Sequence, residues 1–224
     1  MKSTIYNGQN RVALKFINVI KELLTLLKNK YFYVGLVTLI LGIRLNFYSQ
    51  DYLLNYIQNS STLPVLSDLI LDNIPLWDID FIYDIFSLIS LSVLFFYIIH
   101  KAEFKKVPYF LLLCGIFHLI RGAFIVLTPF GNPTGFDGTE GLFNGFSNIE
   151  LGVYPSGHIG ISFMYFLFVK NKTYKTILIL CVIIIALALF LSRGHYTIDI
   201  LSGILFAYAI KSFGDKHLLN IMTN

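Results

Sequence analysis

An arginine, a histidine and an aspartate lie close together near the C-terminal end of the sequence, between two long apolar runs. They are Arg193, His195 and Asp199. Charged side chains in an apolar setting are costly and are usually kept for function. The spacing of four residues places His195 and Asp199 on one face of a helix, where the carboxylate can orient the imidazole and raise its basicity. The alternative is a helix cap beside an interfacial arginine.

A second histidine follows a helix-start signal upstream. The segment reads Pro155-Ser156-Gly157-His158, and proline and serine are typical of a helix N-terminus. The free backbone N–H groups and the helix dipole at such a terminus favour an anion, which the glycine allows to approach closely. We therefore expect His158 and His195 to meet beside an anion site.

This set of side chains suits phosphoryl transfer, which requires placed positive charge and a placed nucleophile. His195 can attack phosphorus while Asp199 orients it, and His158 can give a proton to the leaving oxygen. The helix N-terminus, Arg193 and Arg121 can neutralise the phosphate oxygens. Because no cluster of metal-ligand spacing is evident, we expect a reaction without metal or cofactor.

The composition indicates where these residues must be positioned. The chain has 224 residues, of which 56% are hydrophobic and 13% charged, whereas soluble domains carry about 25% charged residues. This predicts a polytopic membrane protein with an all-α fold. The net charge of +4 is no sign of nucleic-acid binding, because the basic residues are scattered among short loops. Cys114 and Cys181 lie inside apolar runs and are expected to be buried.

Six apolar runs are candidates for transmembrane helices. They cover residues 31–48, 81–99, 107–128, 156–169, 174–191 and 195–213. Residues 11–29 show apolar side chains at helical spacing and predict an amphipathic helix on the inner membrane surface. The expected organisation is an N-terminal interfacial segment (1–30), a six-helix catalytic membrane domain (31–213) and a cytoplasmic tail (214–224).

Loop charges predict the orientation. Lysines gather before the first span, between the second and third, between the fourth and fifth, and in the tail, whereas loops 49–80 and 129–155 are acidic. The positive-inside rule then places both termini in the cytoplasm and the two histidines on the extracytoplasmic or lumenal side.

Other polar residues lie within the expected spans. Arg121 is roughly 10 Å inside the outer end of the third span and is predicted to point into the site. Asp84 lies one turn into the second span, and Arg44 lies near the outer end of the first; neither has an assigned role. Loop 129–155 is rich in glycine and phenylalanine and either forms a lid over substrate access or packs over the bundle mouth.

The Pro155–His158 motif, followed by Ser192-Arg193 and His195-Tyr-Thr-Ile-Asp199, resembles the type 2 phosphatidic acid phosphatase superfamily over roughly residues 76–213. The resemblance implies a covalent phosphohistidine at His195, with Asp199 as its partner and His158 as acid and base. It also implies that Ser156, Gly157 and Arg193 contact phosphate. The compact His-Tyr-Thr-Ile-Asp motif is similar to that of the sphingomyelin-synthase branch.

The resemblance leaves the reaction open between two outcomes. The first phosphatase motif, a lysine and an Arg-Pro pair, is absent, and so is the Cys-Gly-Asp lead-in of the synthases. We expect a metal-independent lipid phosphatase acting on a membrane phospholipid or sphingolipid. The alternative is transfer of a phospho-headgroup to ceramide or another lipid hydroxyl. A non-catalytic lipid carrier is a further alternative, but it does not need both histidines and Asp199 together.

Overall fold

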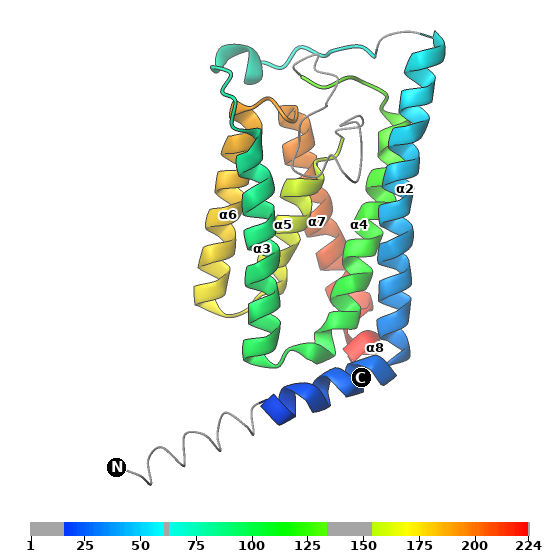
Figure 1. Cartoon of the computed structure of the whole chain (residues 1–224), viewed down its shortest axis with the longest axis vertical. Helices are drawn as coiled ribbons and strands as arrows, with labels where there is room; N and C mark the ends of the chain where they lie inside the picture. Colours follow the sequence, from blue (N-terminus) through cyan, green and yellow to red (C-terminus); the bar gives the residue numbers. More distant parts are fainter. Residues whose placement is uncertain (1–15, 61–62, 134–153, 224) are drawn as a thin grey trace.

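The computed structural model describes residues 16–60, 63–133 and 154–223, and within them it contains helices and no strand (Figure 1). Among the described residues, five helices are long and apolar enough to cross a membrane, which supports the expected all-α membrane protein. They are α2 (Lys30–Ser60), α3 (Asp80–Lys101), α4 (Val107–Leu127), α6 (Lys172–Leu191) and α7 (Thr197–His217). The other described elements are α5, the short helices η1 (Leu71–Asn73), η2 (Phe104–Lys106) and α8 (Leu219–Thr223), and a helix over residues 16–28.

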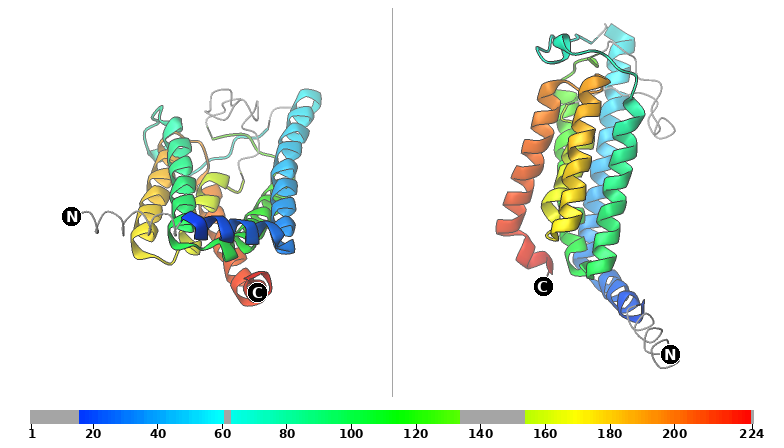
Figure 2. Two further views of the ribbon diagram at one scale, coloured as in Figure 1. Left: turned by 60° about the horizontal axis from the view of Figure 1, so that its bottom comes forward. Right: turned by 90° about the vertical axis from the view of Figure 1, so that its left-hand side faces the viewer.

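Helix α5 (Gly157–Phe168) differs from the expectation of a sixth full span. It has 12 residues and is therefore about 18 Å long, whereas a hydrocarbon core is about 30 Å thick. The helix packs against α3, α4, α6 and α7 in the middle of the bundle (Figures 1 and 2). Protein therefore surrounds the short helix, and Figure 1 shows its N-terminus set below the upper ends of α3 and α6.

Glycines bring α2 and α4 close together along their length. A Cβ atom added at Gly42 would lie 2.7 Å from the carbonyl oxygen of Gly115, and one at Gly115 would lie 2.6 Å from the backbone nitrogen of Leu39. Gly35 and Gly122 make similar close approaches. Small residues at such crossings let helix backbones pack tightly in membranes, where apolar burial alone does not favour association. This packing fixes α2 against α4.

The terminal helices lie at one end of the bundle, and the two histidines lie at the other. A helix over residues 16–28 runs at a steep angle to α2, near α8 (Figure 1). Phe16, Ile20 and Leu23 on this helix are exposed. Its placement on a membrane surface stays a prediction. Arg44 on α2 is exposed and faces away from the core.

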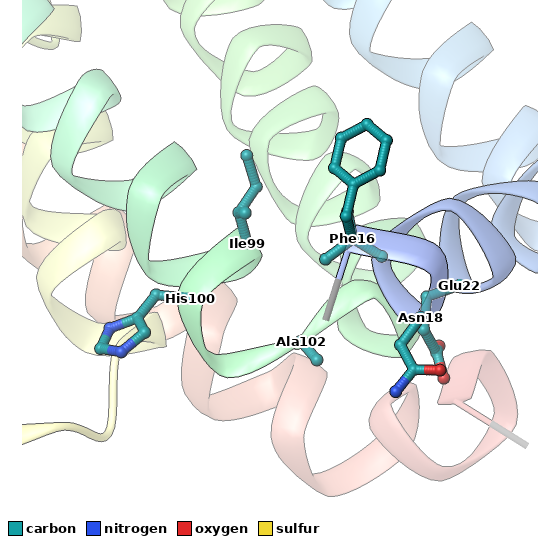
Figure 3. A pocket seen from close by; sticks show the side chains of 7 residues that line it. Phe16, Asn18, Glu22, Ile99, His100 and Ala102 are labelled. Atoms are coloured by element: carbon teal, nitrogen blue, oxygen red, sulfur yellow. The ribbon is translucent and has the colours of Figure 1, made fainter. Parts of the chain in front are cut away.

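A pocket of about 760 Å³ opens between the helix over residues 16–28 and the C-terminal end of α3 (Figure 3). Phe16, Glu22, Ile99 and His100 are among its lining residues. Ile99 is about 22 Å from Asp84 along the α3 axis by helical rise, so the pocket lies outside the candidate active site. The alternatives for loop 129–155 concern residues that lie largely outside the described ones.

Candidate active site

His195 and Asp199 form a buried pair at the start of α7. Nδ1 of His195 lies 3.3 Å from Oδ2 of Asp199, and the two residues are 5% and 0% exposed. The same carboxylate oxygen accepts a hydrogen bond of 2.9 Å from the backbone N–H of Tyr196, the N-cap residue of α7. The Asp199 carboxylate therefore caps α7 and at the same time orients the imidazole of His195. Burial lowers the pKa of His195, against the opposing effect of Asp199, and so favours the neutral ring.

His158 is also paired with a carboxylate. Its Nε2 atom lies 3.1 Å from Oδ1 of Asp84 on α3, and Asp84 is 3% exposed. The ring of Tyr83 packs against His158 with a centroid distance of 4.8 Å. The centroids of the His158 and His195 rings are 6.1 Å apart. Two His–Asp pairs, contributed by α3, α5 and the start of α7, therefore meet at one place.

The N-terminus of α5 is joined to the first turn of α7. The backbone N–H of Ser156 donates to the carbonyl of Asp199 (3.1 Å), and a Cβ atom at Gly203 would lie 2.7 Å from the carbonyl oxygen of Ser156. The first backbone bond of α5 runs from Gly160 N–H to Ser156 C=O (3.2 Å), so the N–H groups of residues 157–159 precede it. The Ser156 hydroxyl is buried and has no hydrogen-bond partner within the described part of the chain. These donors suit an anion.

Arg121 on α4 reaches the same helix N-terminus. Its Nε atom donates to the carbonyl of Pro155 (3.0 Å), and a Cβ atom at Gly157 would lie 3.2 Å from that nitrogen. Its Nη1 atom donates to Oδ1 of Asn46 on α2 (2.6 Å). Asn46 in turn donates to the backbone carbonyl of His118, across the α2–α4 interface (2.6 Å). The guanidinium is therefore held beside the first residues of α5.

Arg193 is directed elsewhere. Its Nη2 atom donates to the carbonyl oxygens of Leu71 (3.1 Å) and Ile74 (3.4 Å), in the loop between α2 and α3. Its φ of 52° lies in the left-handed region and turns the chain between α6 and α7. Arg193 thus ties the segment that carries His195 to this loop, and a contact with phosphate stays a prediction.

Asp68 in the same loop anchors the start of α7 from outside. Its carboxylate accepts hydrogen bonds from the backbone N–H (2.6 Å) and hydroxyl (2.8 Å) of Thr197. Burial raises the pKa of Asp68, but the hydrogen bonds from Thr197, Leu71 and Ile70 outweigh burial and lower it overall. Loop 63–79 therefore holds residues 193–197 in place across the end of the bundle.

Residues 155–214 match a family model described as PAP2 superfamily C-terminal. The match supports the PAP2 superfamily. The matched stretch contains α5, α6, both histidines and most of α7. PAP2 members are generally phosphatases, so the match suggests a lipid phosphoesterase of the phosphatase type. No curated protein and no solved structure matches the chain.

The structure brings together most of the side chains that the sequence predicted for a PAP2-type site. His195, Asp199, His158, Ser156, Gly157 and Arg121 lie around the N-terminus of α5. Sequence reasoning missed Asn46 and Asp68 and assigned no partner to Asp84. An amide within an apolar run was the available signal for Asn46. Within the described residues, no three His, Cys, Asp or Glu side chains gather as metal ligands; a metal-independent reaction stays a prediction.

Proposed function

We propose that the protein is a membrane-embedded lipid phosphatase or phosphotransferase that cleaves a lipid phosphoester through a phosphohistidine at His195. The observation that carries the proposal is the meeting of two His–Asp pairs, with ring centroids 6.1 Å apart, at a helix N-terminus. A nucleophile with an orienting carboxylate, an acid and an anion site are the parts that this chemistry requires.

The first step forms the phosphohistidine. Asp199 occupies Nδ1 of His195, so Nε2 carries the lone pair that attacks phosphorus. As the N–P bond forms, the P–O bond to the lipid breaks, and His158 gives its proton to the leaving oxygen. Asp199 stabilises the positive charge that the His195 ring acquires.

The phosphoryl oxygens need positive charge while these bonds change. The N–H groups at the start of α5, the Ser156 hydroxyl and Arg121 surround the position where an anion fits best. We assign these groups to the phosphate. Arg193 joins them only if its side chain leaves the carbonyl groups of Leu71 and Ile74.

The second step releases the phosphoryl group to an acceptor. The acceptor oxygen attacks phosphorus, His158 takes its proton, and the N–P bond breaks to restore His195. Water as acceptor yields inorganic phosphate, and a lipid hydroxyl yields a new phospholipid, as in sphingomyelin-synthase-like transfer. We favour water, because the synthase lead-in motif is absent from the sequence. Both outcomes compete with a non-catalytic lipid carrier.

We further propose that both termini are cytoplasmic and that the site faces the outer leaflet. The bundle end with the terminal helices carries Lys101, Lys105, Lys172 and other lysines, whereas Asp68, near the other end, lies in an acidic loop. This distribution follows the positive-inside rule. Helix α5 would complete six passes, with its short length placing the site below the outer membrane surface.

The test is turnover by the purified protein on a panel of lipid phosphates and phosphocholine lipids, with and without chelator. We expect wild-type turnover, an acid-labile phosphoryl label on the protein, and loss of both in His195→Ala. The matched control is His217→Ala, an exposed histidine at the opposite end of α7. Turnover that survives in His195→Ala would contradict the phosphohistidine intermediate. Loss of turnover with chelator would contradict a metal-free reaction. Free phosphate indicates a phosphatase, a new phospholipid indicates a transferase, and no reaction favours the carrier.

A further inference from the structure

We infer that Asp84 is a positioning residue that holds the general acid His158 with its Nδ1 atom toward the leaving oxygen. This inference rests on the proposed phosphoryl-transfer function and adds a residue outside the two sequence motifs. Asp84 lies on α3, 74 residues before His158 and beyond the stretch matched by the family model.

The burial of Asp84 is the first observation. A carboxylate in a membrane span is costly and is kept where it is paired and has a role. Asp84 is 3% exposed, and its hydrogen-bond partner in the described part of the chain is Nε2 of His158, at 3.1 Å. Two other carboxylates lie nearby, Asp78 just before α3 and Asp80 at its first residue. Both lie at the end of the bundle and are less buried than Asp84.

The choice of ring nitrogen is the second observation. With Nε2–H donating to Asp84, the Nδ1 atom of His158 is the nitrogen left to carry the transferred proton. In His195 the arrangement is reversed, because Asp199 contacts Nδ1 and leaves Nε2 for attack. The two carboxylates therefore select opposite nitrogens on the two facing rings. One ring acts as nucleophile through Nε2, and the other acts as acid and base through Nδ1.

The contact with Tyr83 restricts the ring plane of His158 but does not decide which way the ring is turned within that plane. The centroids of the Tyr83 and His158 rings are 4.8 Å apart and the rings are inclined at 59°. This contact restricts the plane of the imidazole ring. Rotation of the imidazole by 180° about its Cβ–Cγ bond would leave that contact largely intact but put Cε1 in the place of Nε2 and Cδ2 in the place of Nδ1. The Asp84 hydrogen bond is the contact that distinguishes the two orientations.

The first test uses two substrates for one variant. Loss of general acid catalysis slows departure of a poor leaving group, such as a lipid alcohol, far more than departure of p-nitrophenolate, which needs no proton. We expect Asp84→Asn to lower kcat/KM on the lipid phosphoester by about 10²-fold and to leave kcat/KM on p-nitrophenyl phosphate within a few-fold of wild type. The ratio kcat/KM is used because it covers the steps up to phosphohistidine formation, before His158 acts as a base. Asp84→Glu should recover part of the lipid activity. Asp78→Asn, an exposed carboxylate, is the matched control.

The possible results distinguish a failure of the Asp84 role from a failure of the proposed phosphoryl-transfer function. If wild type hydrolyses the lipid and Asp84→Asn is as active, or loses kcat/KM equally on both substrates, the positioning role is overturned. If neither substrate reacts with wild type, the proposed function fails instead. Nitrogen-15 histidine spectra then still test the geometry: His158, assigned through His158→Gln, should carry its proton on Nε2 in wild type and lose that preference in Asp84→Asn. A wild-type ring protonated on Nδ1 alone would overturn the inference.

Discussion

The guanidinium of Arg121 on α4 donates a 2.6 Å hydrogen bond to the side-chain oxygen of Asn46 on α2. Asn46 is 6% exposed and also donates to the carbonyl oxygens of Gly42 and His118, each at 2.6 Å. One amide therefore bonds across the α2–α4 interface and also holds the cation beside α5. This connects the packing of a helix outside the family match with the charge of the candidate site.

Replacing Asn46 with leucine should weaken the site more than the fold. Arg121 loses an acceptor that sets its position, and a displacement near 1 Å can cost about 10²-fold in rate. We expect kcat/KM on the lipid substrate to fall between about tenfold and 10²-fold. The matched control is Ser49→Ala, which removes the neighbouring interhelical bond from Ser49 to Gly122 (2.8 Å) without touching Arg121. Equal activities of the two variants would contradict this role for Asn46.

The glycine contacts of the same interface make a separate prediction. A methyl group at Gly115 would lie 2.6 Å from the backbone nitrogen of Leu39 and 2.7 Å from the carbonyl carbon of Thr38, so backbone must shift to admit it. We expect Gly115→Ala to lower stability by about 1–3 kcal/mol, measured by thermal unfolding in detergent. Gly131→Ala is the control, since its nearest neighbour would be 3.4 Å away. A Gly115→Ala melting temperature equal to that of the control would refute the tight crossing.

The long helices could be predicted from the sequence because runs of apolar residues report directly on burial in lipid. The predicted span over residues 81–99, for example, lies within α3 (Asp80–Lys101). The embedding of α5 could not be predicted in this way, since an apolar run does not reveal whether lipid or protein surrounds it. The α3, α4, α6 and α7 helices pack around α5, so a helix of 12 residues can lie within the bundle without spanning the hydrocarbon core alone.

The residue types of the two motifs predicted that His158, His195 and Asp199 would come together. Spacing along the chain said nothing about the partners that other helices contribute. Asp84 and His158 are 74 residues apart, so no local periodicity connects them. Arg193 shows the opposite difficulty. Its proximity to His195 favoured a phosphate contact, whereas its left-handed backbone conformation accompanies a side chain bonded to Leu71 and Ile74. Backbone conformation of this kind has no signature in residue spacing.

Asp68 should be needed for both stability and activity. Its carboxylate accepts two hydrogen bonds from Thr197, at the first residue of α7. Loss of a capping acceptor costs about 1 kcal/mol, so Asp68→Ala should lower the melting temperature and the lipid activity together. Because the folded-state pKa of Asp68 lies below 3.8, its contribution is present above that pH and lost as pH falls through the folded value. Asp78→Ala, which removes an exposed carboxylate, is the control, and an unchanged melting temperature in Asp68→Ala would contradict the anchoring role.

The pH dependence of His195 follows from its burial. Burial lowers the pKa of His195 below its ordinary value of 6.5, and the positive charge of Arg121 acts in the same direction, while Asp199 opposes both. The neutral nucleophile therefore persists below pH 6.5, and the acid limb of kcat/KM that belongs to His195 should lie under that value. The contribution of His195 to folding stability also decreases as the pH falls. It is fully present above pH 6.5 and is lost as pH falls through the folded pKa, because the unfolded chain binds the proton first.

Histidine NMR titration of the folded protein in detergent measures this directly, with the His195 resonance assigned through His195→Gln. The expected midpoint lies below 6.5 in wild type and shifts further down in Asp199→Asn, because that variant removes the interaction that opposes burial. His217 is exposed at the far end of α7 and serves as the internal reference. A wild-type midpoint at or above 6.5 would mean that Asp199 outweighs burial. A larger fraction of His195 would then be cationic near neutral pH, and that fraction would need to lose a proton before attack.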